Sequence, residues 1–282
     1  MLRSSSPAMK PFEQPMTWEQ LGVMKQEAAA HMTVAGTVSK TFINLAFACT
    51  GALVAWSLMS RGILPQGLSI PIGLGLIAVS WIGSMIINSK PETARFIGPV
   101  LSMGSGAWAA FISFAIAIAV GAKLAQNPGV LGASGTLTTA EAIRLGSGLI
   151  FQAMLLTFGV VGAIALATGT GVLRIGGTAA KVITGITGGI MFVYLAGWIL
   201  RIFGIGVPFI HGYGMIGIGF SLFVVVVASL NVAMVFSSVL DGVEKKLPKH
   251  FEWVAGHAII ATVIWLYIEI VILLYKLFAS RE

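Results

Sequence analysis

Long apolar runs recur along the chain, and most of the charged residues lie in the short segments between them. Each run has about 20 residues, enough to cross a hydrocarbon core of roughly 30 Å as a helix. Unpaired backbone groups are costly in lipid, so each run should be helical, and the alternating segments typical of a β-barrel are not visible. The pattern predicts an all-α polytopic membrane protein with seven transmembrane helices. We place them near residues 41–60, 66–88, 97–121, 146–169, 179–203, 212–240 and 254–278.

The first 40 residues differ in character from the seven-span membrane domain that we assign to residues 41–282. The stretch SSSPAMKPFEQP is rich in Ser and Pro, as loops are. Residues 17–31, TWEQLGVMKQEAAAH, predict a short amphipathic helix lying on the membrane. The first long apolar run begins too far into the chain for a cleavable signal peptide.

Composition supports a membrane protein and argues against a nucleic-acid-binding one. Of the 282 residues, 57% are hydrophobic and 10% are charged, whereas a soluble domain has about 25% charged residues. The net charge is +7, but the 17 Lys and Arg are scattered singly and form no basic face. Eleven of the 17 lie on the side of the amino-terminal segment. The positive-inside rule therefore predicts a cytoplasmic amino terminus and a carboxyl terminus on the opposite side. We expect the membrane to be the cytoplasmic (inner) membrane.

One acidic residue, Glu269, lies deep within the last apolar run, about 22 Å from its start. An ionised carboxylate at that depth costs about 3 kcal/mol, so Glu269 should face protein or water. Lys276 shares its helix face, and we expect the lysine to reach for the membrane interface. Two interpretations stay open. A neutral Glu269 fixes helix packing through a hydrogen bond, or Glu269 titrates within a polar path and controls ion passage.

Other polar and small residues within the runs are candidates for the same path or for helix contacts. The polar ones are Gln152, Asn231, Ser237 and Ser238, each of which could instead join two helices by a hydrogen bond. Gly185 and Gly189 form a GxxxG pattern, which indicates either close helix contact or ordinary small-residue packing.

Signatures of enzymes, metal sites and cofactors are not found in the sequence. There is no HExxH or GxSxG motif, and nothing supplies a nucleophile–base pair or three metal ligands. The single cysteine, Cys49, lies in an apolar run and is interpreted as a small core residue. We therefore expect neither an enzyme nor a cofactor-binding protein.

Nine local motifs follow one another along the chain: MTVAGTVSKT (32–41), FQAMLLTFGV (151–160), TGVLR (170–174), TGGIMFVYL (187–195), VPFIH (207–211), GIGFSLFVV (217–225), ASLN (228–231), GVEKKLPKHFEW (242–253) and WLYIEI (265–270). Their order and spacing resemble those of a known family, the bacterial branch of the Bax inhibitor family. The resemblance covers nearly the whole chain from about residue 7.

The resemblance implies a last helix surrounded by the other six and a pH-sensitive calcium leak. In that mechanism an acid in the sixth span shares a proton with one in the seventh. Glu269 matches the seventh-span acid, but the sixth-span positions correspond to Val235 and Ser237. A third family acid, in the third span, corresponds to Ser105 before Gly106. We expect Gly106, like the GxxxG glycines, to serve helix packing.

These departures leave two hypotheses for the function. The first is an ion leak, for Ca²⁺ or H⁺, in which Glu269 is the remaining titratable switch, because a lone acid cannot share a proton with a second one. The second is a non-conducting membrane interaction protein that modulates membrane-protein quality control or a membrane protease. The loss of the other family acids favours the second hypothesis.

Overall fold

The computed structural model describes residues 30–64, 66–126, 138–204 and 212–280. In these ranges all seven long helices are apolar enough to cross a membrane and no strand occurs, which confirms the predicted all-α, seven-span fold. A short 3₁₀ helix, η2 (Pro91–Thr93), precedes the third of them. The long helices are α3 (Val34–Ser60), α4 (Gln66–Ser89), α5 (Ala94–Leu124), α6 (Thr139–Gly169), α7 (Gly177–Ile202), α9 (Met215–Glu244) and α10 (Phe251–Ala279).

The helix predicted at residues 17–31 lies, apart from its last two residues, outside the described ranges. The first membrane helix begins at Val34, before the boundary placed at residue 41, because its amino end is capped. The Thr33 side chain accepts a hydrogen bond from the Gly36 amide, which satisfies one of the amide groups left without a partner in the first helical turn.

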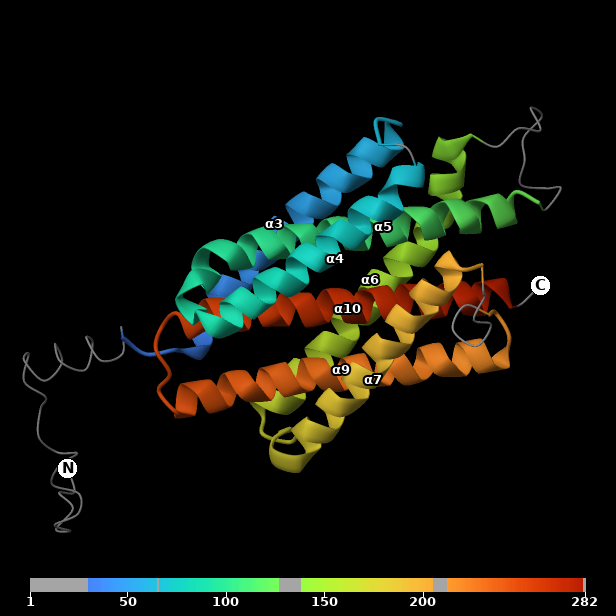
Figure 1. Ribbon diagram of the computed structural model, residues 1–282. Coiled ribbons are helices and arrows are strands. Elements are labelled where there is room, and N and C mark those ends of the chain that lie inside the picture. The colour runs from blue at the N-terminus through green and yellow to red at the C-terminus, as the bar shows by residue number, and fades with distance from the viewer. Residues whose placement is uncertain (1–29, 65, 127–137, 205–211, 281–282) are drawn as a thin grey trace, which may run out of the picture.

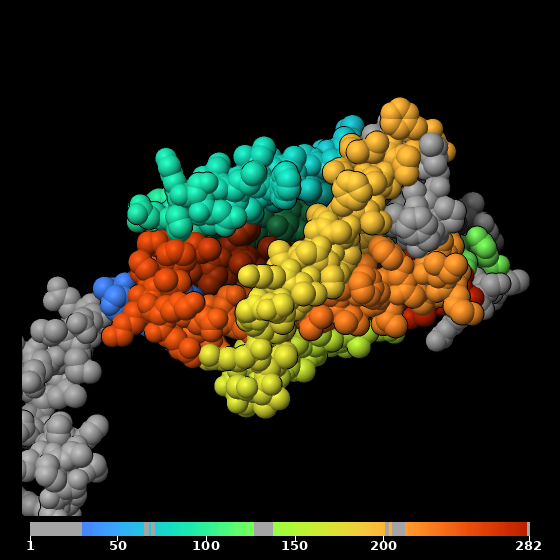
Figure 2. All heavy atoms as spheres, turned by 60° about the horizontal axis from the view of Figure 1, so that its bottom comes forward, coloured from blue at the N-terminus to red at the C-terminus, as the bar shows by residue number. Residues whose placement is uncertain are grey.

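Helix α10 runs through the middle of the bundle (Figure 1). It packs against α3, α5, α6 and α9, while α4 packs on α5 and α7 packs on α9. Figure 2 shows α7 running obliquely across α9 with its outer side uncovered. The start of α3 and the end of α10 lie at opposite ends of the bundle, as an odd number of spans requires (Figure 1).

Small residues allow the central helices to approach closely. A Cβ atom on Gly106 of α5 would collide with the backbone carbonyl of Ala48 on α3, and one on Gly51 of α3 would collide with that of Met103. Backbones at this distance exclude any side chain between them. Gly106 therefore lies at a helix–helix contact, where the sequence placed it.

The GxxxG pattern of α7 makes no such contact within the described chain. Gly185 and Gly189 are exposed, and a Cβ on either would have open space around it. The expected close helix contact at these two glycines is therefore wrong for the neighbouring helices described. The side of α7 that packs on α9 carries larger residues instead, including Ile183 and Ile190.

Buried polar contacts join the first and last helices. Ser102 of α5 donates to Asn44 Oδ1 of α3 at 3.0 Å and lies 3.1 Å from His257 Nδ1 of α10. At the amino end of α3, the buried carboxylate of Glu252 accepts hydrogen bonds from the Thr33 amide and hydroxyl at 3.1 and 3.0 Å. A carboxylate is stabilised at a helix amino end by the helix dipole. Helices α3, α5 and α10 thus form a tightly joined inner group.

Candidate functional site

Glu269 lies inside the bundle, with 2% of its surface exposed. The hydroxyl of Tyr194, from α7, is 3.0 and 3.1 Å from its two carboxylate oxygens. The indole Nε1 of Trp265 donates to one of them at 3.1 Å. Trp265 comes one helical turn before Glu269, so both side chains share a face of α10. The acid faces protein rather than lipid, and hydrogen-bond donors from two helices hold it.

Helix α7 presents Tyr194 to Glu269 because one side of the helix packs on α9. Ile183, Thr187, Ile190 and Tyr194 recur at helical spacing along that side. Ile190 packs against two valines of α9, and the Tyr194 ring meets that of Phe220 edge-on with centroids 6.1 Å apart. These apolar contacts fix the position of Tyr194 along α9. Its hydroxyl extends beyond α9 and contacts Glu269 of α10.

A second buried ionisable side chain, Lys276, lies two turns beyond Glu269 on α10. It is 4% exposed, and its ammonium donates to the carbonyl of Gly217 at 3.1 Å and to Ser221 Oγ at 2.7 Å. The expectation that Lys276 reaches for the interface is therefore wrong. The start of α9 covers the lysine, and oxygens of α9 take the place of water around its ammonium group.

Asn231 continues the polar contacts towards the other end of α9. Its amide nitrogen donates to Thr187 Oγ1 of α7 at 2.8 Å and to the Val227 carbonyl at 2.9 Å. Asn231 is 6% exposed, so both contacts are shielded from the surroundings. Asn231 therefore joins α7 to α9 at a point nearer than Glu269 to the carboxyl end of α9.

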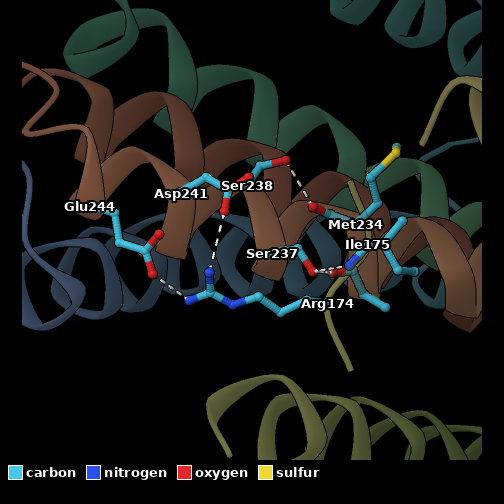
Figure 3. Close-up of polar contacts among 8 residues, drawn as sticks. Arg174, Ile175, Met234, Ser237, Ser238, Asp241 and Glu244 are labelled. Carbon is cyan, nitrogen blue, oxygen red and sulfur yellow. Dashed lines mark hydrogen bonds and ion pairs between the residues drawn. The ribbon is translucent and has the colours of Figure 1, made fainter. Parts of the chain in front are cut away.

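Ser237 lies near the end of α9, where the loop that precedes α7 attaches (Figure 3). Its hydroxyl donates to the Ala233 carbonyl at 2.8 Å and accepts a hydrogen bond from the Ile175 amide at 2.9 Å. The neighbouring Arg174 lies 2.6 Å from Glu244 and 3.7 Å from Asp241. This hydrogen bond with Glu244 raises the pKa of Arg174, so the guanidinium is charged at every physiological pH.

These contacts form four separate hydrogen-bonded groups at successive levels along α7, α9 and α10, and apolar side chains of α7 and α9 pack at the same interface. We call the set of four groups the polar column. Its α9 residues run from Gly217 to Ser237, about 20 residues or about 30 Å along the helix axis, which is the thickness of a hydrocarbon core. Glu269 lies near its middle, level with Val224 and Val227. The side chains of the polar column are Ser237, Asn231, Thr187, Tyr194, Glu269, Ser221 and Lys276.

Comparison with known proteins identifies the family of the chain. Residues 14–279 match the sequence profile of the family described as Bax inhibitor 1 like. The chain belongs to the Bax inhibitor 1 like family. No curated protein and no solved structure matches it.

The resemblance implied a second acid in the sixth span, at the positions of Val235 and Ser237, and in the structure neither of these residues contacts Glu269. Val235 packs in an apolar cluster with Val239 and Ile259, and Ser237 binds the loop before α7. The described acids of α9, Asp241 and Glu244, lie at the end of the helix and pair with Arg174. Across the described residues, no three His, Cys, Asp or Glu side chains come together to hold a metal ion.

Three candidate residues for the path, Gln152, Ser105 and Ser238, lie away from the polar column. Gln152 is exposed on the outer side of α6, so it does not line an interior path. Ser105 donates to the Leu101 carbonyl of its own helix at 2.9 Å. Ser238 is exposed and donates to the Met234 carbonyl at 2.8 Å (Figure 3). Each of these residues has a polar side chain of the kind that could line a path, but it lies on a helix face that does not contact the polar column.

Tyr194 was not predicted from the sequence as a site residue, and the surroundings of Lys276 were predicted wrongly. Tyr194 comes seven residues after Thr187, and Lys276 comes seven residues after Glu269. A spacing of seven residues places both members of a pair on one helix face. That spacing, applied to polar residues within the apolar runs, is the signal that could have found both.

Proposed function

We propose that the chain forms a pH-responsive ion leak along the polar column and that Glu269 is its titratable switch. The observation that supports the proposal is a row of hydrogen-bonding side chains as long as a membrane is thick, with a carboxylate near the middle. Ionisable residues at this depth usually mark ion or proton pathways. The packed arrangement described above corresponds to the closed state.

Protonation of Glu269 changes the bonds that hold α7 to the bundle. An ionised carboxylate only accepts hydrogen bonds, and here it accepts them from Tyr194 and Trp265. A protonated carboxyl group has less acceptor capacity and needs an acceptor of its own. Among the described residues, the Tyr194 contact is one of the few polar links between α7 and the rest of the bundle. Loss or rearrangement of this hydrogen bond therefore favours a shift of α7.

The charged groups around Glu269 are few. Tyr194 approaches from α7, and Lys276 lies two turns along its own helix. Among the residues whose side chains the structure describes, the other ionisable groups of the helices packed around α10, and of α7, lie near helix ends, apart from the exposed Cys49 of α3. They are Lys40 of α3, Arg95 and Lys123 of α5, Glu141 and Arg144 of α6, Lys181 of α7, and Asp241 and Glu244 of α9.

The proposal is tested by replacing Glu269 with Gln in proteoliposomes. Efflux of H⁺, K⁺ and Ca²⁺ is measured between about pH 5 and 8, the range in which shifted carboxylates titrate. The wild type should show a pH-dependent leak, and Glu269→Gln should make the rate independent of pH. The matched control is Glu141→Gln, because Glu141 lies off the column in a capping box at the start of α6, a role that Gln also fills. A flux–pH curve that Glu269→Gln leaves unchanged removes Glu269 from the gate.

A second candidate function is favoured by one observation, the uncovered glycine side of α7. Gly185 and Gly189 are exposed on a membrane helix, and small residues of this kind allow another helix to approach. A non-conducting protein that modulates a membrane protease or another membrane protein would use such a surface. Purification of the tagged chain from its native membrane tests this candidate. A stoichiometric partner lost in Gly185→Leu, with no ion flux in proteoliposomes, would favour it over the leak.

A further inference from the structure

The outer side of α4 carries a shallow groove close to the end of the helix. Its volume is about 350 Å³, and it is lined by Ile82, Met85, Ile86, Ser89 and Lys90. Positions 82, 85, 86 and 89 follow the i, i+3, i+4, i+7 spacing of one helix face. The groove is therefore apolar along the membrane span and polar where the span ends.

The opposite side of α4 is packed, which leaves the groove to the surroundings of the bundle. A Cβ atom on Gly83 would collide with the Leu101 side chain of α5, and Ile87 is buried in a cluster with the same leucine. In the groove, Ile82 and Met85 are 58% and 59% exposed. Because α4 is long and apolar enough to cross a membrane, this exposed face meets lipid acyl chains.

Positive charge gathers at the polar end of the groove. Lys90 follows directly on α4, and Arg95 lies in the first turn of α5, with η2 between them. Both side chains are exposed, as is that of Glu92, the one acid of this turn. Two cations against one acid leave a net positive charge beside the groove.

Trp253 of α10 marks the level of the lipid headgroups at this end of the bundle. Its half-buried ring packs against the cluster of Ile87, Ala94 and Leu101, where α4 meets α5. Tryptophan is enriched at the boundary between membrane and water. The ammonium of Lys40 lies 4.9 Å from the centroid of the ring. Lys40 therefore adds a third cation near the depth at which phospholipid phosphates lie.

We infer that the groove is a binding site for an anionic phospholipid. An acyl chain lies along Ile82, Met85 and Ile86, and the phosphate of the headgroup contacts the cations of the turn. Ammonium and guanidinium groups form charge-assisted hydrogen bonds with phosphate, and arginine can present two parallel N–H donors to it. From the membrane interior outwards, the apolar wall and the cations follow the order in which a phospholipid presents its chain and its phosphate.

The alternative is that these cations only orient the chain in the membrane, as basic residues at a cytoplasmic end do without binding a particular lipid. Attraction of anionic lipids is then diffuse, and Lys245, an exposed cation at the same end of the bundle, contributes as much as Lys90. Lys245 follows α9, which packs on α10, whereas α4 packs on α5 (Figure 1). Lys245→Gln is therefore the matched control for Lys90→Gln.

The experiment is native mass spectrometry of the full chain in detergent. The chain is titrated with phosphatidylglycerol, with phosphatidylethanolamine of the same acyl chains, or with the soluble headgroup glycerophosphoglycerol. A cation near anionic headgroups strengthens their attraction about fivefold, so two cations should let the wild type bind its first phosphatidylglycerol at least about tenfold more tightly than phosphatidylethanolamine. Glycerophosphoglycerol should not bind, because it has no acyl chain for the groove.

The variants separate the charge from the fold. Lys90→Gln and Arg95→Gln should each weaken the binding of phosphatidylglycerol about fivefold, and Lys245→Gln should leave it within about twofold. Lys90→Arg keeps the charge and should bind as the wild type does. Glu92→Gln removes a charge that repels the phosphate and should strengthen binding, a change that loss of folding could not produce.

Each other result overturns the inference. Equal affinity of the wild type for the two lipids, or equal effects of Lys90→Gln and Lys245→Gln, would indicate diffuse attraction alone. Glycerophosphoglycerol that binds as tightly as the lipid would indicate an anion site that takes no acyl chain. A wild type that elutes as a dimer in gel filtration and binds no phosphatidylglycerol would assign the groove to a second copy of the chain. None of these results depends on ion flux, so the proposed leak is tested separately.

Discussion

Removal of a single oxygen atom tests whether the bond between Tyr194 and Glu269 keeps the polar column closed. Tyr194→Phe deletes the hydroxyl that donates to the carboxylate at 3.0 Å and leaves the ring, which packs edge-on against Phe220. Trp265 remains as a donor to Glu269. The change therefore weakens one interhelical link without opening a large cavity.

The magnitude follows from the kind of bond. Hydrogen bonds between membrane helices contribute about 0.6 kcal/mol on average and at most about 1.7 kcal/mol. Bonds to charged groups lie at about 1.5–3 kcal/mol in soluble proteins. A loss of about 1–2 kcal/mol from the closed state changes the ratio of closed to open molecules by a factor of about 5–30. If the open state is the rare one, the leak rate should rise by the same factor.

The assay is ion efflux from proteoliposomes at a pH where the wild type is mostly closed. Tyr267→Phe is the matched control, because Tyr267 is also on α10 and its hydroxyl lies 2.6 Å from Ser113 Oγ of α5, away from the polar column. We expect Tyr194→Phe to leak faster and Tyr267→Phe to leak at the wild-type rate. Equal rates for all three proteins would refute the closing role of Tyr194, and a faster leak in both variants would indicate a general loss of packing.

Three further predictions concern packing, an ion pair and topology. Gly106→Val places methyl groups against the Ala48 carbonyl and should destabilise the protein by about 1–3 kcal/mol, whereas Gly75→Val, which meets open space, should leave the unfolding midpoint in detergent almost unchanged. Arg174→Ala removes an exposed ion pair, so the difference in midpoint from wild type should be small and should vanish in high salt; a difference that persists there would contradict a purely ionic contribution. In a background with Cys49 replaced, Ser280→Cys in intact cells should react with a membrane-impermeant maleimide and Lys245→Cys should not, and the reverse result would invert the proposed orientation.

The helices themselves could be predicted because lipid leaves the backbone few choices. A run of 20 apolar residues has to form a helix in a bilayer, and each predicted span has its counterpart in the structure. The ends were harder to place. The start of α3 depends on Thr33 and on Glu252, which is more than 200 residues away in the chain. A local sequence pattern cannot predict a contact between residues so far apart.

The candidate site could be predicted only in part. Glu269 was recognisable because a lone acid in a long apolar run must be sheltered. Asn231 and Ser237 were found by residue type and also face the polar column, but Gln152 and Ser105 have equally suitable side chains and face elsewhere. Which face of a membrane helix is covered depends on its neighbours. Hydrophobicity does not reveal it, because lipid and protein interior are both apolar.

Lys276 also shows that neighbouring helices decide whether a side chain is covered. Long basic side chains near a helix end usually extend to the headgroups, so the general rule predicted an exposed ammonium group. The start of α9 covers that position and offers the Ser221 hydroxyl and the Gly217 carbonyl, which the sequence of α10 could not indicate.

The contact between Thr33 and Glu252 has a consequence for biosynthesis. A ribosome makes the first membrane helix early and the last one at the end, yet the amide and hydroxyl at the entry of α3 find their acceptor only on α10. Until translation has passed residue 252, the amino end of the first helix must rely on water, headgroups or the insertion machinery for hydrogen bonds. A nascent chain that stalls earlier therefore lacks the acceptor that the completed protein provides for these two donors.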